Sequence, residues 1–254
     1  MLNEILTADI WRFFAIFARL GSAMMIMPGF GGTLVPSRFR LLLAVAISFL
    51  LMPVLGTRIP PLPNHPAALA ILVLGEATVG VFLGVVVLSL MTALDVAGTF
   101  IGFQTGLTNA FSFDAVAAQQ SQLLSSFLGN LALVIILSSD LHHLMLQALV
   151  DSYTLFPAGT PLPLGDFSAT LARMMSASFS LGVRISAPLL VFGLIFYAGM
   201  GLLSRLVPQM QVFFVIMPLQ VLTGLWMMMV SLSVMMLLFL NAFGAGLTPY
   251  LAPR

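Results

Sequence analysis

A few charged side chains stand inside long apolar runs, and they are the groups best placed to do chemistry. Glu76, Asp95 and Arg184 lie in or at the end of such runs, and Arg12 and Arg19 lie one heptad apart in the first run. A charge at the centre of a bilayer costs about 2.5–3.5 kcal/mol on insertion scales, so these groups are expected to face a partner helix, a cavity or another subunit. They could form a proton or ion pathway, or they could hold helices and subunits together. The second interpretation is favoured, because the sequence lacks the dense acidic series typical of proton carriers.

A second candidate for chemistry is the run Asp140-Leu141-His142-His143, which offers up to three metal ligands. The other histidine, His65, lies in a proline-rich connection, whereas membrane di-iron enzymes need several histidine clusters. The run is therefore better interpreted as a polar patch at a helix end. The sequence contains neither a Gly-x-Ser-x-Gly motif nor a glycine-rich phosphate loop with lysine. These observations predict no bound metal, no cofactor and no enzymatic activity.

The composition excludes a soluble globular protein. Of the 254 residues, 60% are apolar and 7% are charged, against about 25% charged in soluble domains. The net charge of +1 gives no reason to expect nucleic-acid binding, and without cysteine no disulfide or thiol chemistry is possible. The first apolar run lacks the basic leader and small-residue cleavage site of a signal peptide, so it is expected to remain in the protein.

The apolar residues form blocks long enough to cross a membrane, which needs about 20 helical residues. They are too uniformly apolar for the strands of a membrane barrel. The fold class is therefore predicted as all-α, a polytopic membrane protein of about six helical blocks arranged as hairpins. Proline-rich connections at 58–66 and 156–166 separate some of them, and arginine counts in the loops set no orientation. The blocks span 10–27, 39–55, 67–94, 123–150, 171–199 and 212–243.

Glycines recur every four residues along the third block and its extension. Gly80 and Gly84 form one pair, and Gly98, Gly102 and Gly106 form a second series. Each series places missing side chains on one helical face, where another backbone can approach closely. The spacing predicts tight helix packing and, by itself, no particular function.

The most polar stretch of the chain follows these glycines and reads QTGLTNAFSFDAVAAQQSQ from Gln104 to Gln122. Irregular polar backbone beside membrane helices is tolerated where it is buried in protein or lines a water-filled cavity. The stretch is therefore either a re-entrant or plugging segment or an ordinary surface loop. The residues that would serve a plug are Gly106, Asn109, Phe111, Phe113 and Asp114.

A polar helical hairpin tip joins the last two blocks. Pro208 is expected to break one helix, and Pro218 to kink the next. Arg205 precedes the break, where a cation complements a helix C-terminus. The residues that define this hairpin motif are Ser204, Arg205, Pro208, Gln209, Phe213, Phe214 and Pro218.

The hairpin string LLSRLVPQMQVFFVIMPLQ resembles the signature of the FliR/SctT family, the R-type or T-type subunits of flagellar and virulence type III export gates. The resemblance covers nearly the whole chain, including Glu76 before the first glycine pair and the run AGTFIGFQTGL at 97–107. Gln211 departs from the asparagine usual in relatives, a carboxamide for a carboxamide. The Met-Pro-Leu at 217–219 is more typical of flagellar than of virulence members.

The resemblance implies an architecture and partners that composition does not. Residues 1–170 would be P-like, with a plug at about 106–120, and residues 171–254 would form a Q-like hairpin. The family joins P-type and Q-type subunits in the bacterial inner membrane and flagellar basal body, forming the entry of the channel for unfolded flagellar proteins. Phe111 and Phe113 would then be the occluding side chains, and no catalytic residue would be needed.

Two other functions remain open at this point. The chain could serve the equivalent virulence-type III secretion system. It could also be a small-solute permease, with Glu76, Asp95, Asp140 and Arg184 as pathway residues.

Overall fold

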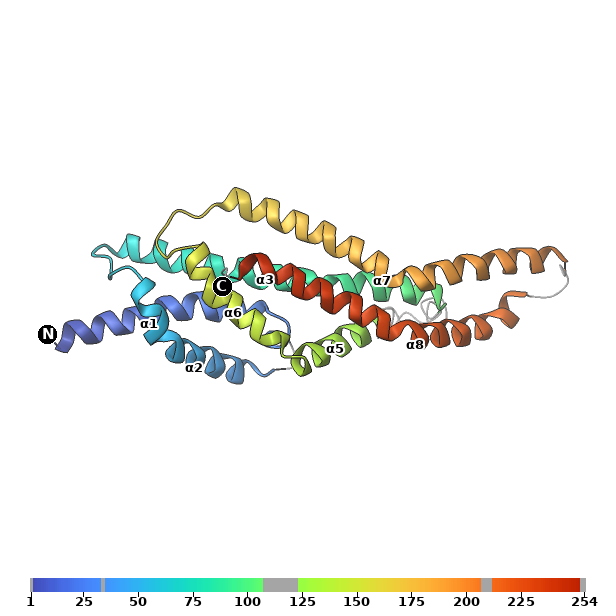
Figure 1. The fold of residues 1–254 in the computed structure, drawn as a ribbon, viewed down its shortest axis with the longest axis horizontal. Coiled ribbons are helices and arrows are strands. Elements are labelled where there is room, and N and C mark those ends of the chain that lie inside the picture. Colours follow the sequence, from blue (N-terminus) through green and yellow to red (C-terminus); the bar gives the residue numbers. More distant parts are fainter. Residues whose placement is uncertain (1, 33–34, 107–122, 207–211, 252–254) are drawn as a thin grey trace. The chain divides into compact units, whose positions relative to one another are not determined.

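The chain folds into long helices, as Figure 1 shows for the computed structural model. The structure describes residues 2–32, 35–106, 123–206 and 212–251. Within these residues every regular element is helical, so the predicted all-α class is confirmed. The α-helices are α1 (Leu2–Ile26), α2 (Ser37–Leu55), α3 (Pro66–Gln104), α5 (Leu123–Ser138), α6 (Leu141–Leu155), α7 (Leu164–Leu206) and α8 (Val212–Leu247), with short 3-10 turns η1 (Gly56–Arg58) and η3 (Thr248–Tyr250).

Four helical segments within the described residues are long and apolar enough to cross a membrane. They are Ser37–Arg58, Pro66–Gln104, Leu164–Leu206 and Ile216–Tyr250. The fourth apolar block, expected as one run, is instead two helices, α5 and α6, which meet at an angle of 77°. Asp140 stands at the bend with a positive φ of 59°, a left-handed conformation that aspartate tolerates better than most residues. If the bent pair counts as one span, the total rises to five.

Of the described helices, α3 and α7 extend furthest beyond the apolar blocks that predicted them. α3 continues to Gln104 and includes Asp95 and Thr99, and α7 begins at Leu164 and continues to Leu206. An apolar run marks where a helix meets lipid or protein, whereas the hydrogen-bonded helix can continue through polar residues with good propensity. The connections shorten accordingly, since the second proline-rich linker ends before Leu164.

The chain divides into two compact units. Unit 1 comprises residues 1–90, 136–174 and 244–254, and unit 2 comprises residues 91–135 and 175–243. This division groups segments that are distant in sequence, so compactness does not test the predicted boundary near residue 170. The assignment of a P-like part and a Q-like hairpin stays a prediction.

Unit 1 has an aliphatic and aromatic core built by α1, α2, η1 and α6. Trp11, Ile16, Leu20, Leu55 and Tyr153 are all buried in it. The indole Nε1 of Trp11 donates a hydrogen bond of 3.0 Å to the carbonyl of Pro60, which satisfies the polar edge of a side chain that is otherwise buried.

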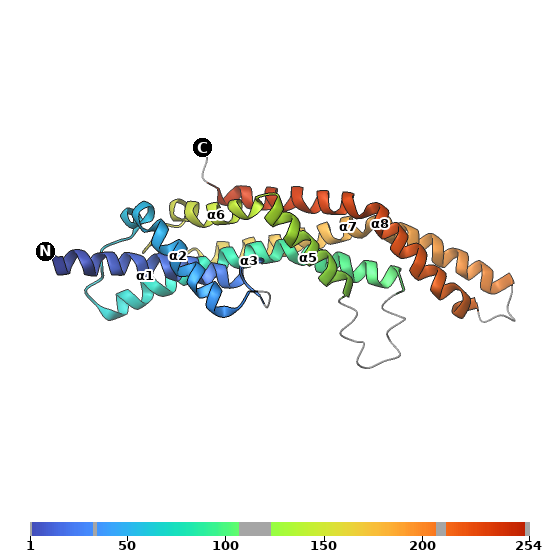
Figure 2. The same cartoon turned by 90° about the horizontal axis from the view of Figure 1, so that it is seen from below.

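A second cluster in unit 1 is aromatic. The rings of Phe82 and Phe167 stack with centroids 4.0 Å apart. Phe156 and Tyr250 meet the Phe82 ring edge-on. Through this cluster the start of α7 and η3 pack onto α3 and the end of α6, and Figure 2 shows η3 beside α6.

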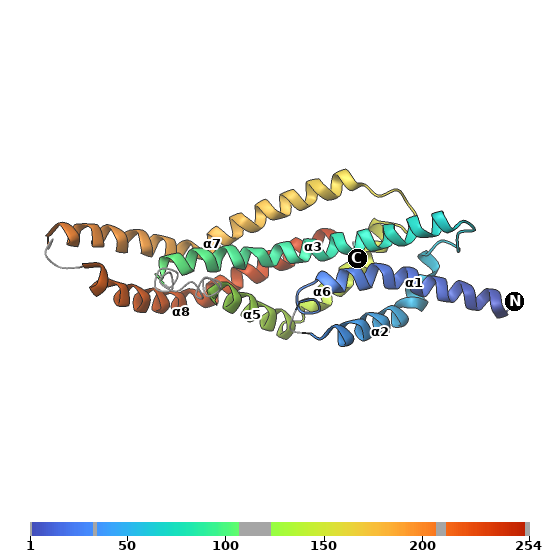
Figure 3. The same cartoon turned by 180° about the vertical axis from the view of Figure 1, so that it is seen from behind.

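Unit 2 contains most of the last two helices and the last turns of α3. Tyr197 of α7 accepts a hydrogen bond from Gln220 of α8, and the two helices run side by side there in Figures 1 and 3. Many large apolar side chains of this unit point outward, among them Leu194, Leu222 and Met229. Surfaces of this kind require lipid or other membrane helices as neighbours.

Candidate functional site

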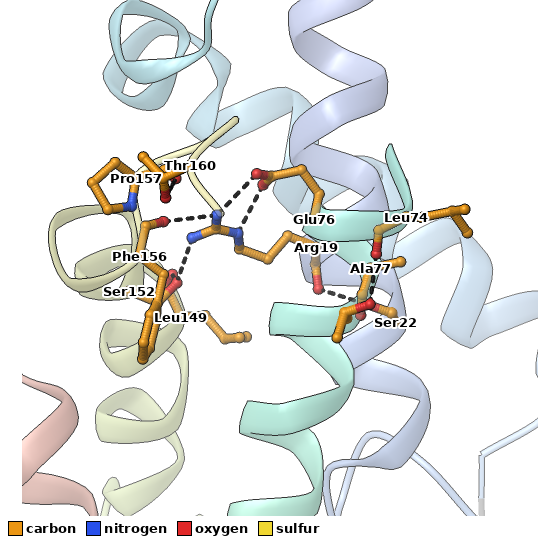
Figure 4. A network of polar contacts seen from close by, with 11 residues as sticks. Arg19, Ser22, Leu74, Glu76, Ala77, Leu149, Ser152, Phe156, Pro157 and Thr160 are labelled. Carbon is orange, nitrogen blue, oxygen red and sulfur yellow. Dashed lines mark hydrogen bonds and ion pairs between the residues drawn. The ribbon is translucent and has the colours of Figure 1, made fainter. Parts of the chain in front are cut away.

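The most constrained polar site in unit 1 is a buried ion pair between Arg19 of α1 and Glu76 of α3 (Figure 4). Arg19 donates from Nε to Oε2 of Glu76 over 2.8 Å and from Nη2 to Oε1 over 3.0 Å. The two side chains are 1% and 3% exposed. Two parallel N–H···O bonds of this kind fix the direction of both side chains as well as their separation.

The remaining contacts of the Arg19 guanidinium join a third element to the pair. Nη1 donates to Oγ of Ser152 over 3.1 Å, and Nη2 donates to the carbonyl of Phe156 over 2.9 Å. The guanidinium carbon also lies 3.8 Å from the centroid of the Tyr153 ring, within the range of a cation–π contact. Arg19 therefore connects α1, α3 and α6 through one side chain, as Figure 4 shows.

This arrangement suits a structural clamp better than a proton relay. Arginine keeps its proton under all ordinary conditions, and both Glu76 oxygens already accept hydrogen bonds from it. Removing either partner would leave an uncompensated buried charge, which costs about 3–5 kcal/mol. Of the two interpretations of the intramembrane charges, the geometry around Glu76 favours the one in which they hold helices together.

The glycines Gly80 and Gly84 lie where α3 passes closest to α1. A Cβ at Gly80 would lie 3.0 Å from the carbonyl carbon of Arg19, and one at Gly84 would lie 2.9 Å from Cβ of Ile26. Ser22 bridges the same contact, because its hydroxyl lies 3.0 Å from the Arg19 carbonyl and 3.1 Å from the Ala77 carbonyl. The missing side chains thus allow the backbone approach that positions the ion pair.

The other two predicted intramembrane charges do not join this network. Asp95 and Arg184 belong to unit 2, and both are exposed. The backbone of Asp95 takes part in packing, since its carbonyl accepts a hydrogen bond of 3.1 Å from Ser125. Gly98 faces the backbone of the same Ser125, and Gly102 is buried one turn further along α3.

The Asp140, His142 and His143 side chains gather at the N-terminal end of α6. Their potential ligand atoms lie within 4.8 Å of one another, and the carboxylate of Asp140 lies 3.6 Å from Nδ1 of His143. The side chains of Asp140 and His143 are 78% and 69% exposed. His142 is half-buried. The group is thus a largely exposed polar cluster at a helix end, the position of the polar patch interpreted from the sequence.

Unit 2 holds a second polar site, at the C-terminal end of α3. The Gln220 carboxamide donates hydrogen bonds to the Gln104 carbonyl over 3.0 Å and to the Tyr197 hydroxyl over 2.9 Å. Gly106 ends this turn with a positive φ of 73°. It is the first of the five predicted plug residues; Asn109, Phe111, Phe113 and Asp114 lie outside the described residues.

The hairpin motif is described in part. Ser204 and Arg205 lie in the last turn of α7, and Arg205 is exposed there. Pro208 and Gln209 lie outside the described residues. Pro218 lies inside α8, and the first turn of this helix contains the two remaining motif residues, Phe213 and Phe214.

Comparison with known proteins decides the family. The chain matches the family described as bacterial export proteins, family 1, over residues 10–246. The chain belongs to this family. It is 38% identical to the flagellar biosynthetic protein FliR of Caulobacter vibrioides over 218 residues, which cover 86% of this chain and 87% of the relative. It is also 29% identical to the FliR protein of Bacillus subtilis (91% and 90% covered) and 30% identical to that of Escherichia coli (76% and 74% covered).

Membership in the bacterial export family decides between the functions that the residues left open, an export-gate subunit or a small-solute permease. The relatives are flagellar biosynthetic proteins, and the matches extend over most of both chains. The chain is a multi-pass membrane subunit of the flagellar type III export gate, and it works with other export proteins.

Sequence reasoning missed several residues of the two polar sites. Arg19 was noted as an intramembrane charge, but nothing in the sequence distinguished it from Arg12 or Arg184 as the partner of Glu76. A usable signal was the hydroxyl and aromatic pair Ser152-Tyr153 directly after the fourth apolar block, in a helix that continues to Leu155, since buried polar groups need partners. Gln220 was missed because a lone glutamine in a membrane helix gives no indication of which helix it contacts.

Proposed function

We propose that the chain assembles with the P-type and Q-type subunits of the export gate in the inner membrane, and that together they form the mouth of the channel for unfolded flagellar proteins. Support comes from the family match over residues 10–246 and from the outward-facing apolar side chains. Leu50, Ile71, Leu194 and Met229 are each more than two-thirds exposed. So much exposed apolar surface on both units suits a subunit that neighbouring subunits and lipid cover.

The assembly part of this proposal is tested by purification in mild detergent followed by measurement of the intact mass. The expected result is a complex that contains two other small hydrophobic proteins, and deletion of the gene is expected to abolish flagellar assembly. A lone polypeptide that is monodisperse, folded and able to move a small solute into vesicles would contradict the proposal and favour a permease.

The plug is the second part of the proposal. The segment at about 106–120 would close the channel at rest, with Phe111 and Phe113 as the occluding side chains because of their size and position in the segment. Gly106 and the preceding helix end are held on α7 and α8, which supports a defined starting point for the segment. No residue needs to act chemically in such a gate, since opening is a displacement.

The plug assignment predicts a specific leak. Shortening residues 107–118 is expected to make the membrane permeable to small ions while protein export partly survives. The measurement is the ion conductance or growth sensitivity of cells that express the shortened protein, with its membrane level checked. Unchanged ion permeability at a normal protein level would remove the plug from the proposal while leaving the assembly part intact.

A further inference from the structure

The C-terminal end of α3 is bonded to both helices of the α7–α8 hairpin within unit 2. Gln220 of α8 is 6% exposed, and its Nε2 donates to the Gln104 carbonyl over 3.0 Å and to the Tyr197 hydroxyl over 2.9 Å. One carboxamide therefore contacts two other helices. We call the residues of this contact the glutamine junction: Gln104, Thr105, Gly106, Gly193, Tyr197, Gln220 and Gly224.

Glycine stands at each close approach in the glutamine junction. Gly193 of α7 faces the side chain of Gln104, and a Cβ there would lie 2.5 Å from its Cδ. A Cβ at Gly224 of α8 would lie 2.9 Å from Cα of Thr105, which is fully buried. At Gly193 and at Gly224 the space of the missing side chain is filled by a group at the C-terminal end of α3. A sliding movement of α3 along α7 or α8 would therefore bring atoms of neighbouring helices into overlap.

The hydrogen bonding explains why a glutamine is needed at this place. The last carbonyls of a helix have no partner within the helix, and in an apolar environment each unpaired carbonyl is costly. At the end of α3 the Gln104 carbonyl is satisfied by Gln220. Gly106, at a positive φ of 73°, brings the chain out of the helix against the same carboxamide, with its Cβ position 3.0 Å from Cδ of Gln220.

We propose that the glutamine junction is a fixed anchor, at which the end of α3 stays joined to the α7–α8 hairpin while proteins are exported. Gln220 is its positioning residue, because it alone in the junction bonds to both α3 and α7. The inference rests on the proposed function in one respect, since it concerns the working gate. It goes beyond that function by naming the contact that must not open.

A disulfide placed across the junction tests the anchor directly. The chain contains no cysteine, so the double variant Thr105→Cys with Gly224→Cys would carry the sole thiol pair. A Cβ at position 224 would lie 3.1 Å from the Thr105 Cβ, which is shorter than the separation of about 3.5–4.5 Å found in disulfides. The two helices must therefore separate slightly to accept the bond, and the single variant Gly224→Cys measures the effect of that separation on export. Secreted flagellar protein is measured before and after oxidation, and again after reduction, with each single-cysteine variant as the control.

The fixed anchor predicts that the cross-linked protein exports at the rate of its reduced form, within about twofold. Export that stops on oxidation and returns on reduction, in the double variant alone, would show that the junction opens and would overturn the inference. That outcome leaves the proposed function intact. By contrast, export that never depends on the gene at all would refute the proposed function itself.

Substitution of Gln220 tests the anchor without any cross-link, in case the double variant does not accumulate. Gln220→Leu keeps the size of the side chain and removes both hydrogen bonds, each of which makes a modest net contribution. The expected result is that partners still co-purify while export falls about tenfold, the effect of about 1.4 kcal/mol. Gln147→Leu is the matched control, because Gln147 bonds within its own helix to Asp151. Undiminished export by Gln220→Leu would overturn the role of Gln220.

Discussion

Arg19 and Glu76 meet through two parallel hydrogen bonds, at 2.8 and 3.0 Å, with both side chains almost completely removed from the surface. The pair joins α1 to α3, and the same guanidinium reaches α6 through Ser152. Buried charge pairs add little stability compared with apolar packing, but they are costly to break from one side. The pair therefore selects one packing of α1 against α3, because only the register that brings the two charges together avoids an unpaired buried charge.

In a double-mutant cycle at this pair, each single substitution is expected to be costly, and the double substitution is expected to cost less than the sum of the two. Arg19→Met or Glu76→Met alone is expected to lower the stability of the purified protein by about 3–5 kcal/mol, because the remaining charge stays buried and unpaired. The two substitutions together should cost clearly less than their sum, since neither charge remains. Thermal unfolding in detergent measures the effect.

The control for this cycle is the exposed pair of Arg12 with Asp9. Its atoms also lie 3.0 Å apart, but the side chains are 44% and 39% exposed. Arg12→Met is expected to change stability by less than about 1 kcal/mol, as is usual for surface pairs. A double variant of Arg19 and Glu76 that loses the full sum of the single losses would mean that the two side chains are not energetically coupled, and would contradict the structural clamp.

Two glycines of α3, Gly75 and Gly80, are expected to respond differently to substitution by a larger residue. Gly80→Val would place carbon atoms on the Arg19 backbone and on Ser22, whereas Gly75 has no atom within 4 Å of its Cβ position. Gly80→Val is therefore expected to separate α1 from α3 and to lower the yield of folded protein, with loss of flagella. Gly75→Val should be tolerated, because its side chain would point into open space. Membrane protein level and motility provide the measurement, and equal behaviour of the two variants would contradict the packing.

The fold could be predicted from the sequence to the extent that it depends on local properties. Apolar block length and the prolines indicated an all-α membrane protein, and the glycine pair Gly80 and Gly84 indicated a close helix contact. The polar run at 140–143 was interpreted as a helix end, but the sharp bend at Asp140 was not predicted, because an apolar block that continues on both sides of a single left-handed residue looks like one helix. Such a residue changes the direction of the chain without changing its composition.

The polar sites were harder to predict, because they depend on which helices become neighbours. Glu76 was recognised as a residue that needs a partner, yet Arg12, Arg19 and Arg184 were equal candidates. Burial alone separates them: Arg19 faces the core of unit 1, whereas Arg12 and Arg184 are exposed. Tertiary neighbours of this kind are not encoded in the spacing along a helix, so one sequence without an alignment does not give them.

The aromatic cluster of unit 1 predicts a large effect from one truncation. Phe82 is 5% exposed and stacks on Phe167 at 4.0 Å between centroids. Phe82→Ala is expected to lower the free energy of unfolding by about 3–5 kcal/mol, the usual cost of emptying a buried aromatic site. Phe103→Ala is the control on the same helix, because Phe103 is 51% exposed. The difference in midpoint of thermal unfolding between the two variants is the measurement, and a difference near zero would contradict the cluster.

The exposed end of α7 predicts an effect on assembly and little effect on folding. Arg205 lies in the last turn of α7, where a cation complements the negative end of the helix dipole. Arg205→Glu reverses that charge, so the proposed partners are expected to co-purify less well, while Arg205→Lys should restore them. Arg173→Glu serves as the matched control, because Arg173 is also exposed on α7 but lies far from its last turn. The measurement is the yield of partner subunits per molecule of this chain after purification in mild detergent. If Arg205→Glu leaves this yield undiminished at an unchanged level of the chain, this helix end lies outside the subunit contacts.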